Sequence, residues 1–365
     1  MSEPAESEPS RSGDAEAPRP SLVDWEFAGA MARRLGGSGP RVSAQEAADI
    51  VADLHETARL AHAPVAETSR LVSPPGSAPV LVVDRPGWTQ ANIGSMRSLL
   101  DPVIAKVQSG TAGATNATVA AFGGKITGAE VGAILAFLST KILGQYDLAP
   151  AGKPALLLVA PNIVQAEREM GVDPHDFRLW VAMHEETHRV QFTAVPWLRD
   201  HMVDTTRALS LELAPTPSEL AERLQQFVTR LPDVFSPGST GLAEVFLTSA
   251  QKAKVDEVTA VMSLIEGHAE VVMDDVGPAV IPSVAAIREK FTRRRQGVGQ
   301  FDRFLRRILG LEAKMRQYAD GATFVRAVVD KVGLDGFNAV WTSPETLPSA
   351  AEMADPALWV SRVHR

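Results

Sequence analysis

Hydrophobic positions along this chain recur mostly at helical spacing. Residues 21–35 carry apolar side chains three or four positions apart, which predicts a first helix. Ser43, followed by Glu46 three positions later, has the pattern of a capping box and predicts where a second helix begins. Further helices are expected over about 93–107 and 128–143.

Two short apolar runs predict strands instead. Residues 79–83 and 155–159 consist mostly of Val and Leu and lie next to prolines, which is typical of short buried strands. The chain after Pro174 again has helical spacing, apart from proline-bearing loops. The whole pattern predicts a mainly α fold, of the α+β type, with a small β-sheet.

The ends and the length of the chain indicate how it is divided. Residues 1–20 hold five acidic residues and four prolines but no branched aliphatic side chain, so they are predicted to be a disordered acidic tail. Residues 236–241 are a candidate linker, but a short one, and the chain shows no internal repeat. Residues 21–365 are therefore expected to form one large domain, with room for two lobes around a functional cleft.

Composition and charge narrow the classes of function. Lys and Arg number 36 against 44 Asp and Glu, so the net charge of −8 disfavours a nucleic-acid binder. Cysteine is absent, so any metal site has to use histidine and carboxylate ligands. The sequence has neither the pattern of a signal peptide nor a segment apolar enough to span a membrane. We therefore expect a cytoplasmic protein without a membrane partner.

Residues 184–188 read His-Glu-Glu-Thr-His, the HExxH motif, within a segment of helical spacing. Residues four apart lie on the same face of a helix, so His184 and His188 can point at one metal ion. Glu185 lies about 100° around the helix, where its carboxylate can reach a water molecule rather than the metal. Catalytic zinc sites use three protein ligands and one open position. The motif therefore predicts a zinc site with Glu185 as the general base.

A second cluster supplies candidates for the third ligand. Glu266 and Glu270 are four apart on another apolar helical segment and share a face, whereas His268 points roughly to the opposite side. Gly267 is expected to let this helix approach the motif helix closely. We therefore predict Glu266 as the third zinc ligand and Glu270 as the group that orients a ligand histidine. His268 and then Glu270 are the alternative third ligands.

Simpler interpretations apply to each charged cluster. The two motif histidines could be core residues satisfied by hydrogen bonds, and the second cluster could be a solvated helix face. The apolar residues 271–273 disfavour the latter, because a buried carboxylate pair without a cation is costly. Residues 288–307 hold eight basic side chains, which could bind an anionic substrate. Their amphipathic spacing favours a solvated helix face.

The segments that carry these residues resemble a known family, the type 2 zincin-like metallohydrolases of actinobacteria and related bacteria. The resemblance runs through most of the chain from about Ser21 and leaves out the acidic tail. Five segments carry it: 184–192, 266–274, 310–321, 337–348 and 355–363. Members are commonly labelled as hydrolases or as proteins associated with the biosynthesis of a deazaflavin cofactor.

This resemblance implies a mostly helical zincin-like fold with a small sheet near the metal. By the same resemblance, His184 and His188 match the family's ligand positions and Glu185 its general-base position. The Glu-Gly-x-Ala pattern that begins at Glu266 looks like the third-ligand segment of Glu-ligated zincins. No GxGxxG motif follows a predicted strand, so the deazaflavin label is not carried over as a cofactor.

The leading hypothesis is a zinc-dependent hydrolase that acts on peptide bonds or another small substrate. Such an enzyme also needs a group that stabilises the oxyanion, for which the candidates are Tyr146, Tyr318, His268 and Arg189. The main alternative is a non-catalytic, zinc-stabilised scaffold or regulatory binding protein, in which a fourth protein ligand would close the site. A hydrolase of non-peptide substrates is a further alternative. Glu185 favours catalysis, because a structural site gains nothing from a carboxylate beside the water position.

Overall fold

The computed structural model describes residues 21–109, 117–213, 248–296 and 311–365. The predicted tail and the candidate linker lie outside these ranges. The helices of the described chain are α1 (Trp25–Leu35), α2 (Ala44–Ser69), α3 (Arg85–Ser109), α4 (Ala117–Ser139), α5 (Ala160–Met170), α6 (Pro174–Ala194), α7 (Pro196–Leu213), α10 (Ser249–Val276), α11 (Val284–Gln296), α13 (Leu311–Phe337), α14 (Ala350–Ala354) and α15 (Pro356–Val363). Three strands accompany them: β1 (Val80–Val83), β2 (Gly144–Asp147) and β3 (Ala155–Val159).

The predicted fold class is confirmed, because the described chain is mainly α-helical with one small sheet. The strand order is β1-β3-β2, with β1 parallel and β2 antiparallel to the central strand. Both predicted strands are present, but β2 was not predicted, since Gly-Gln-Tyr-Asp contains no apolar run. None of the described helices combines the length and the apolar character that crossing a membrane requires.

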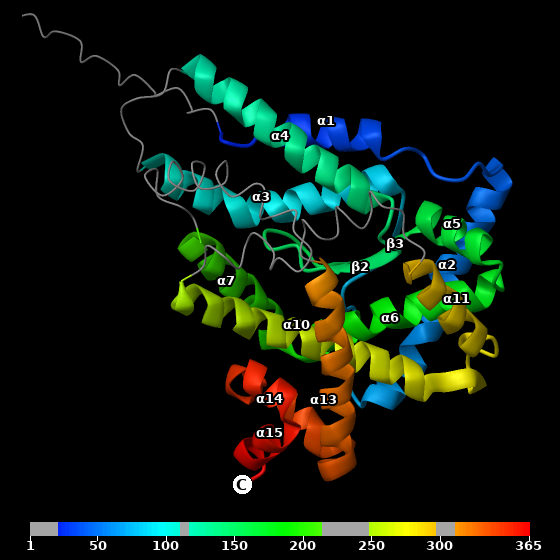
Figure 1. Ribbon diagram of the computed structural model, residues 1–365. Coiled ribbons are helices and arrows are strands. Elements are labelled where there is room, and N and C mark those ends of the chain that lie inside the picture. The colour runs from blue at the N-terminus through cyan, green and yellow to red at the C-terminus, as the bar shows by residue number, and fades with distance from the viewer. Residues whose placement is uncertain (1–20, 110–116, 214–247, 297–310) are drawn as a thin grey trace, which may run out of the picture.

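The central strand β3 is buried on both faces, which explains its continuous apolar sequence. Leu157 and Val159 pack in a cluster with Trp88 of α3 and with residues of α1 and α4. Leu156 and Leu158 point the other way and pack with residues of α2, α5 and α6. The sheet thus lies between a layer of α1, α3 and α4 and the helices that carry the predicted motif (Figure 1).

Two helices begin earlier in the chain than their apolar spacing predicted. Helix α3 begins at Arg85, where Asp84 accepts a hydrogen bond from the amide of Gly87 at 2.7 Å. Helix α4 extends back into a Gly- and Ala-rich segment that carries little helical signal. Its glycines are needed for packing, because a Cβ at Gly128 would lie 2.6 Å from a backbone oxygen of α1. They let α4 lie directly against α1.

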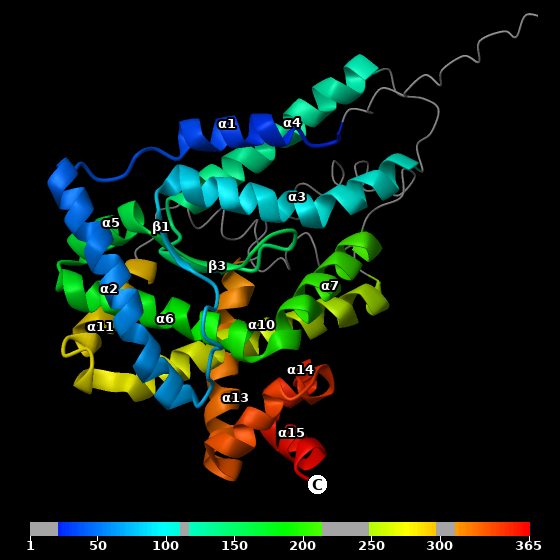
Figure 2. The ribbon, with the colours of Figure 1, turned by 180° about the vertical axis from the view of Figure 1, so that it is seen from behind.

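Ser43 caps α2 as predicted, because its hydroxyl accepts a hydrogen bond from the amide of Glu46 at 3.1 Å. The other half of the expected capping box is absent from this end. The Glu46 carboxylate instead accepts a hydrogen bond from Arg168 of α5 at 2.6 Å. This contact ties α2 to α5, and the view from behind shows α2 running along α6 (Figure 2).

Gly267 was predicted to be a point of close approach to the motif helix, and this prediction was wrong about which helix approaches it. Gly267 faces α13 rather than the motif helix, and a Cβ built on it would lie 2.1 Å from the backbone of Gly321. A Cβ on Gly321 would in turn lie 2.0 Å from the carbonyl oxygen of Ser263. The two backbones are therefore in direct contact where α13 crosses α10 (Figure 1). This crossing fixes α10 at the residue next to Glu266.

Candidate metal centre

Helix α6 presents the HExxH residues from a firmly anchored segment. Asp173 caps its N-terminus by accepting a hydrogen bond from the amide of Asp176 at 2.9 Å. Pro174 occupies the first turn, where its fixed φ suits a helix. The helix packs against the sheet through β2 and β3, and against α2 and α10 on its other sides. The motif lies in the middle of this buried helix.

The structure brings His184, His188 and Glu266 together, and these three side chains form a group whose ligand atoms all lie within 4.8 Å of one another. The Nε2 atoms of the two histidines are 3.2 Å apart, and their rings are nearly perpendicular at 86°. Glu266 places one carboxylate oxygen 3.6 Å from Nε2 of His184 and the other 3.7 Å from Nε2 of His188. Three donors from two helices therefore converge on one point.

The spacing of these donors fits a zinc ion. Ligands about 2.0–2.1 Å from zinc in a tetrahedral arrangement lie roughly 3.3–3.4 Å from one another. The three observed separations, 3.2, 3.6 and 3.7 Å, bracket that value. Two imidazoles and one carboxylate are also a ligand set used by catalytic zinc sites. The residues present therefore fit the metal that the motif implies.

Glu185 lies beside this group but does not belong to it. Its side chain is buried and rests against the backbone of Gly144, where a Cβ would lie 2.5 Å from Cγ of Glu185. Burial, and then the negative charge of Glu266, raise the pKa of the Glu185 carboxyl well above its usual value. A carboxylate with a raised pKa is a stronger base, so Glu185 is suited to accept a proton.

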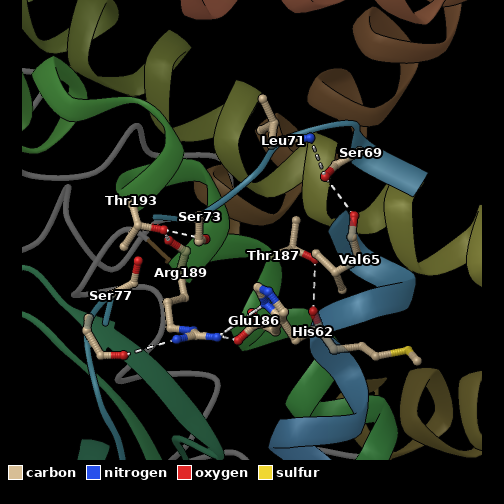
Figure 3. A network of polar contacts seen from close by, with 12 residues as sticks. His62, Val65, Ser69, Leu71, Ser73, Ser77, Glu186, Thr187, Arg189 and Thr193 are labelled. Carbon is tan, nitrogen blue, oxygen red and sulfur yellow. Dashed lines mark hydrogen bonds and ion pairs between the residues drawn. The ribbon is translucent and has the colours of Figure 1, made fainter. Parts of the chain in front are cut away.

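The opposite face of α6 holds a second polar cluster, which anchors the helix. Glu186 is fully buried and accepts hydrogen bonds from Nε and Nη2 of Arg189, each at 2.7 Å. Nδ1 of His62, on α2, lies 2.7 Å from the same carboxylate. Arg189 also donates to the backbone oxygen of Ala78 at 3.2 Å, just before β1. Figure 3 shows Arg189 and His62 converging on Glu186.

The other predicted site residues are placed apart from the three ligands. His268 is buried on the side of α10 that faces Phe337 and Trp341, with its Nδ1 2.9 Å from Gln191. Glu270 is exposed one turn beyond Glu266. The geometry thus favours Glu266 over both alternative third ligands, and the role of Glu270 as an orienting group gains no support from its exposure.

The four candidates for the oxyanion-stabilising group also differ in their surroundings. The guanidinium of Arg189 is engaged by Glu186, and His268 faces away from the ligands. Tyr146 is mostly buried in β2, where it stacks on Phe192 at 5.4 Å between ring centroids. Burial raises the pKa of its phenol, so Tyr146 keeps its proton near neutral pH. Tyr318 lies outside the residues whose side chains the structure describes, as does the second half of the basic segment.

Two contributors at the site were not predicted from the sequence: Gln191 contacts His188, and Gly144 makes room for Glu185. Met273, one of the apolar residues expected to bury the site, places its sulfur 3.3 Å from Nδ1 of His184. The sequence contains a signal for Gln191, since this residue follows His188 by three positions and so shares its helix face. It contains no signal for Gly144, because the residue that Gly144 contacts lies in another element.

The sequence also matches a known family. A sequence model of the zincin-like metallopeptidase family matches residues 23–360. The chain belongs to that family. The resemblance to zincin-like proteins noted in the sequence is thereby confirmed.

One solved structure is similar to this zincin-like chain over almost its whole length. It is the crystal structure of a protein from Chloroflexus aurantiacus, described as a "putative hydrolase with a novel fold". The two chains are 30% identical, the match covers 94% of this chain and 99% of the other, and the TM-score is 0.66. No curated protein matches the chain.

Proposed function

We propose that this protein is a zinc-dependent hydrolase that cleaves peptide bonds with water as the nucleophile. The observation that carries the proposal is the convergence of His184, His188 and Glu266 beside the buried carboxylate of Glu185. Membership of a zincin-like metallopeptidase family and the description of the Chloroflexus aurantiacus protein both support a hydrolase.

His184, His188 and Glu266 would hold the zinc ion. A bound zinc ion supplies Lewis acidity, which polarises a substrate carbonyl and makes water acidic enough to lose a proton near neutral pH. Among the described residues, no further His, Asp or Glu joins the group of three. A three-ligand site with an open position is the arrangement of catalytic zinc, whereas structural zinc is closed by a fourth protein ligand. This supports a hydrolase over the scaffold alternative.

Glu185 is the group that moves the proton. Its carboxylate takes a proton from the attacking water and later passes it to the leaving nitrogen of the cleaved bond. The pocket formed with Gly144 holds the carboxylate in place, so little reorganisation is needed for the transfer. A positioned general base of this kind contributes roughly 10²–10⁴-fold to the rate.

The position of β2 supports a peptide as the substrate. In the described sheet, β2 is an edge strand that pairs only with β3, and it begins at Gly144, beside Glu185. An extended peptide can add to such an edge through main-chain hydrogen bonds. A substrate bound in this way would run past the general base.

Metal analysis combined with a cleavage assay tests this proposal. Purified protein is expected to contain about one zinc per chain, and to cleave members of a broad peptide library. A chelator should remove both the zinc and the cleavage, and added zinc should restore them. Zinc-loaded protein that cleaves no member of the library would rule out the peptidase. Protein without affinity for zinc would rule out the whole mechanism.

A further inference from the structure

Gln191 connects a predicted metal ligand to a buried histidine that has no role in the proposed reaction. It lies one turn after His188 on α6 and is fully buried between α6 and α10. Its Oε1 is 3.0 Å from Nδ1 of His188. Its Nε2 is 2.8 Å from the backbone oxygen of Ile265 and 2.9 Å from Nδ1 of His268. One side-chain amide thus makes three contacts in a site without solvent.

The backbone oxygen of Ile265 fixes the orientation of this amide. A carbonyl oxygen only accepts hydrogen bonds, so the NH₂ group of Gln191 has to face Ile265, and Oε1 has to face His188. Oε1 is itself only an acceptor, so Nδ1 of His188 has to carry the proton. The lone pair of the His188 ring is then left on Nε2, the atom that faces His184 and Glu266.

The same reasoning fixes the tautomer of His268. The NH₂ group of Gln191 donates to Nδ1 of His268, so the proton of that ring sits on Nε2. Among the described residues, buried Nε2 has no hydrogen-bond partner, and the ring lies 5.5 Å from Phe337 and 5.4 Å from Trp341 between centroids. The apolar surroundings of this side of the ring leave Gln191 as the polar partner of His268.

We propose that Gln191 and His268 are a positioning pair that holds His188 in the tautomer and orientation required of a metal ligand. The inference rests on the proposed function in one respect, namely that His188 binds zinc. The pair acts through His188 and touches neither metal nor substrate. Nδ1 of the other ligand histidine, His184, lies 3.3 Å from the thioether sulfur of Met273, a weak acceptor.

Two substitutions at Gln191 separate orientation from packing. Gln191→Met has a similar volume but offers no oxygen to His188, so zinc affinity should fall by about 10–100-fold. Gln191→Glu keeps an oxygen for Nδ1 of His188 but loses the NH₂ group that Ile265 and His268 hold, so its zinc affinity should lie between those of Gln191→Met and the wild type. Thr187→Val is the matched control: Thr187 is buried next to His188 but donates only to the backbone of its own helix, at 2.8 Å. Its zinc affinity should not change.

Zinc affinity is measured on the full chain by competition with a chromophoric chelator. The inference is overturned if Gln191→Met binds zinc as tightly as the wild type. It is equally overturned if Gln191→Glu binds zinc as tightly as the wild type, since the NH₂ group and its contact with His268 would then play no part. Circular dichroism checks that each variant is folded.

Nitrogen NMR of the metal-free wild type keeps the inference testable if a variant does not fold. With both ring nitrogens labelled, His188 should show its proton on Nδ1 and His268 should show its proton on Nε2. Spectra of His188→Gln and His268→Gln assign the two signals among the 8 histidines of the chain. The opposite tautomer at His188 would overturn the inference. Wild-type protein with these tautomers but no affinity for zinc would refute the proposed function and leave the positioning pair standing.

Discussion

Two polar clusters lie on opposite faces of α6: the anchoring face, with Glu186, Arg189 and His62, and the metal face, with His184, His188 and Glu266 of α10. The two clusters contain the same kinds of side chain but hold them at different distances. On the anchoring face, Glu186 is fully buried and lies 2.7 Å from nitrogens of Arg189 and of His62. On the metal face, the oxygens of Glu266 lie 3.6 and 3.7 Å from the imidazole nitrogens. The first set of distances is that of strong hydrogen bonds, and the second is too long for them.

This difference shows how a binding site can be recognised beside a structural ion pair. At the anchoring face, the chain supplies its own cation, Arg189, and the buried charge of Glu186 is satisfied internally. At the metal face, one carboxylate and two imidazole nitrogens surround one point at the separations expected of ligands around an ion. The anchoring face therefore stabilises the helix, and we expect the metal face to take up a cation from outside.

Removing a zinc ligand should have the largest effect, a loss of zinc binding at the metal face that leaves the anchoring face unchanged. His184→Ala, His188→Ala and Glu266→Ala should each abolish stoichiometric zinc binding, because two protein ligands hold the ion weakly. Elemental analysis after dialysis measures the zinc content. A variant that keeps one zinc per chain would remove its residue from the ligand set.

The next effect concerns Glu185, which lies on the metal face without being a ligand. Glu185→Gln is nearly isosteric and lacks the basic oxygen, so hydrolysis should fall by roughly 10²–10⁴-fold. Zinc content and thermal stability should stay close to those of the wild type. Loss of zinc in this variant would show that Glu185 has a structural role, and full activity would show that another residue is the base.

Substitutions at the anchoring face should lower the stability of the fold rather than the zinc content. Arg189→Met leaves Glu186 buried without its main cation, which should cost about 3–5 kcal/mol. For a chain of this length, that corresponds to a decrease in the melting temperature of roughly 4–7 °C. Glu186→Gln combined with Arg189→Met should recover most of the loss, since no buried charge is then left unpaired. An Arg189→Met variant with an unchanged melting temperature would contradict the anchoring role.

The smallest effect is expected at Glu270, on the same helix as Glu266 but exposed. Glu270→Ala should change zinc affinity by no more than about twofold, as for surface substitutions worth under about 0.5 kcal/mol. The chelator competition assay compares it directly with Glu266→Ala. A loss of about 10–100-fold would restore Glu270 as the orienting group that the sequence suggested.

Local signals in the sequence predicted the parts of the fold that depend on local physics. The strand at 155–159 was predicted to the residue, because both of its faces are buried and its sequence is continuously apolar. The cap at Ser43 and the face shared by His184 and His188 follow from local helix geometry. Such features need no knowledge of what lies across from them.

The features that were missed depend on contacts between distant segments. Strand β2 is short and polar and exists because β3 pairs with it. Gly267 was recognised as a point of close approach, but its partner turned out to be Gly321 in α13. His268 was predicted to point away from Glu266, as it does, but its partners there, Gln191 and two aromatic rings, lie in other elements and were not predicted. Sequence patterns show which face a residue occupies, and only the fold shows what that face meets.

The crossing of α10 and α13 also sets an order of events while the chain is being synthesised. The histidine pair and Glu185 leave the ribosome well before Gly321, and chains begin to fold from their N-terminal part. Until α13 has emerged, α10 can pack against α2, α6 and α7 but lacks the backbone that crosses it at Gly267, next to Glu266. The candidate metal centre therefore gains the last of its packing only late in translation.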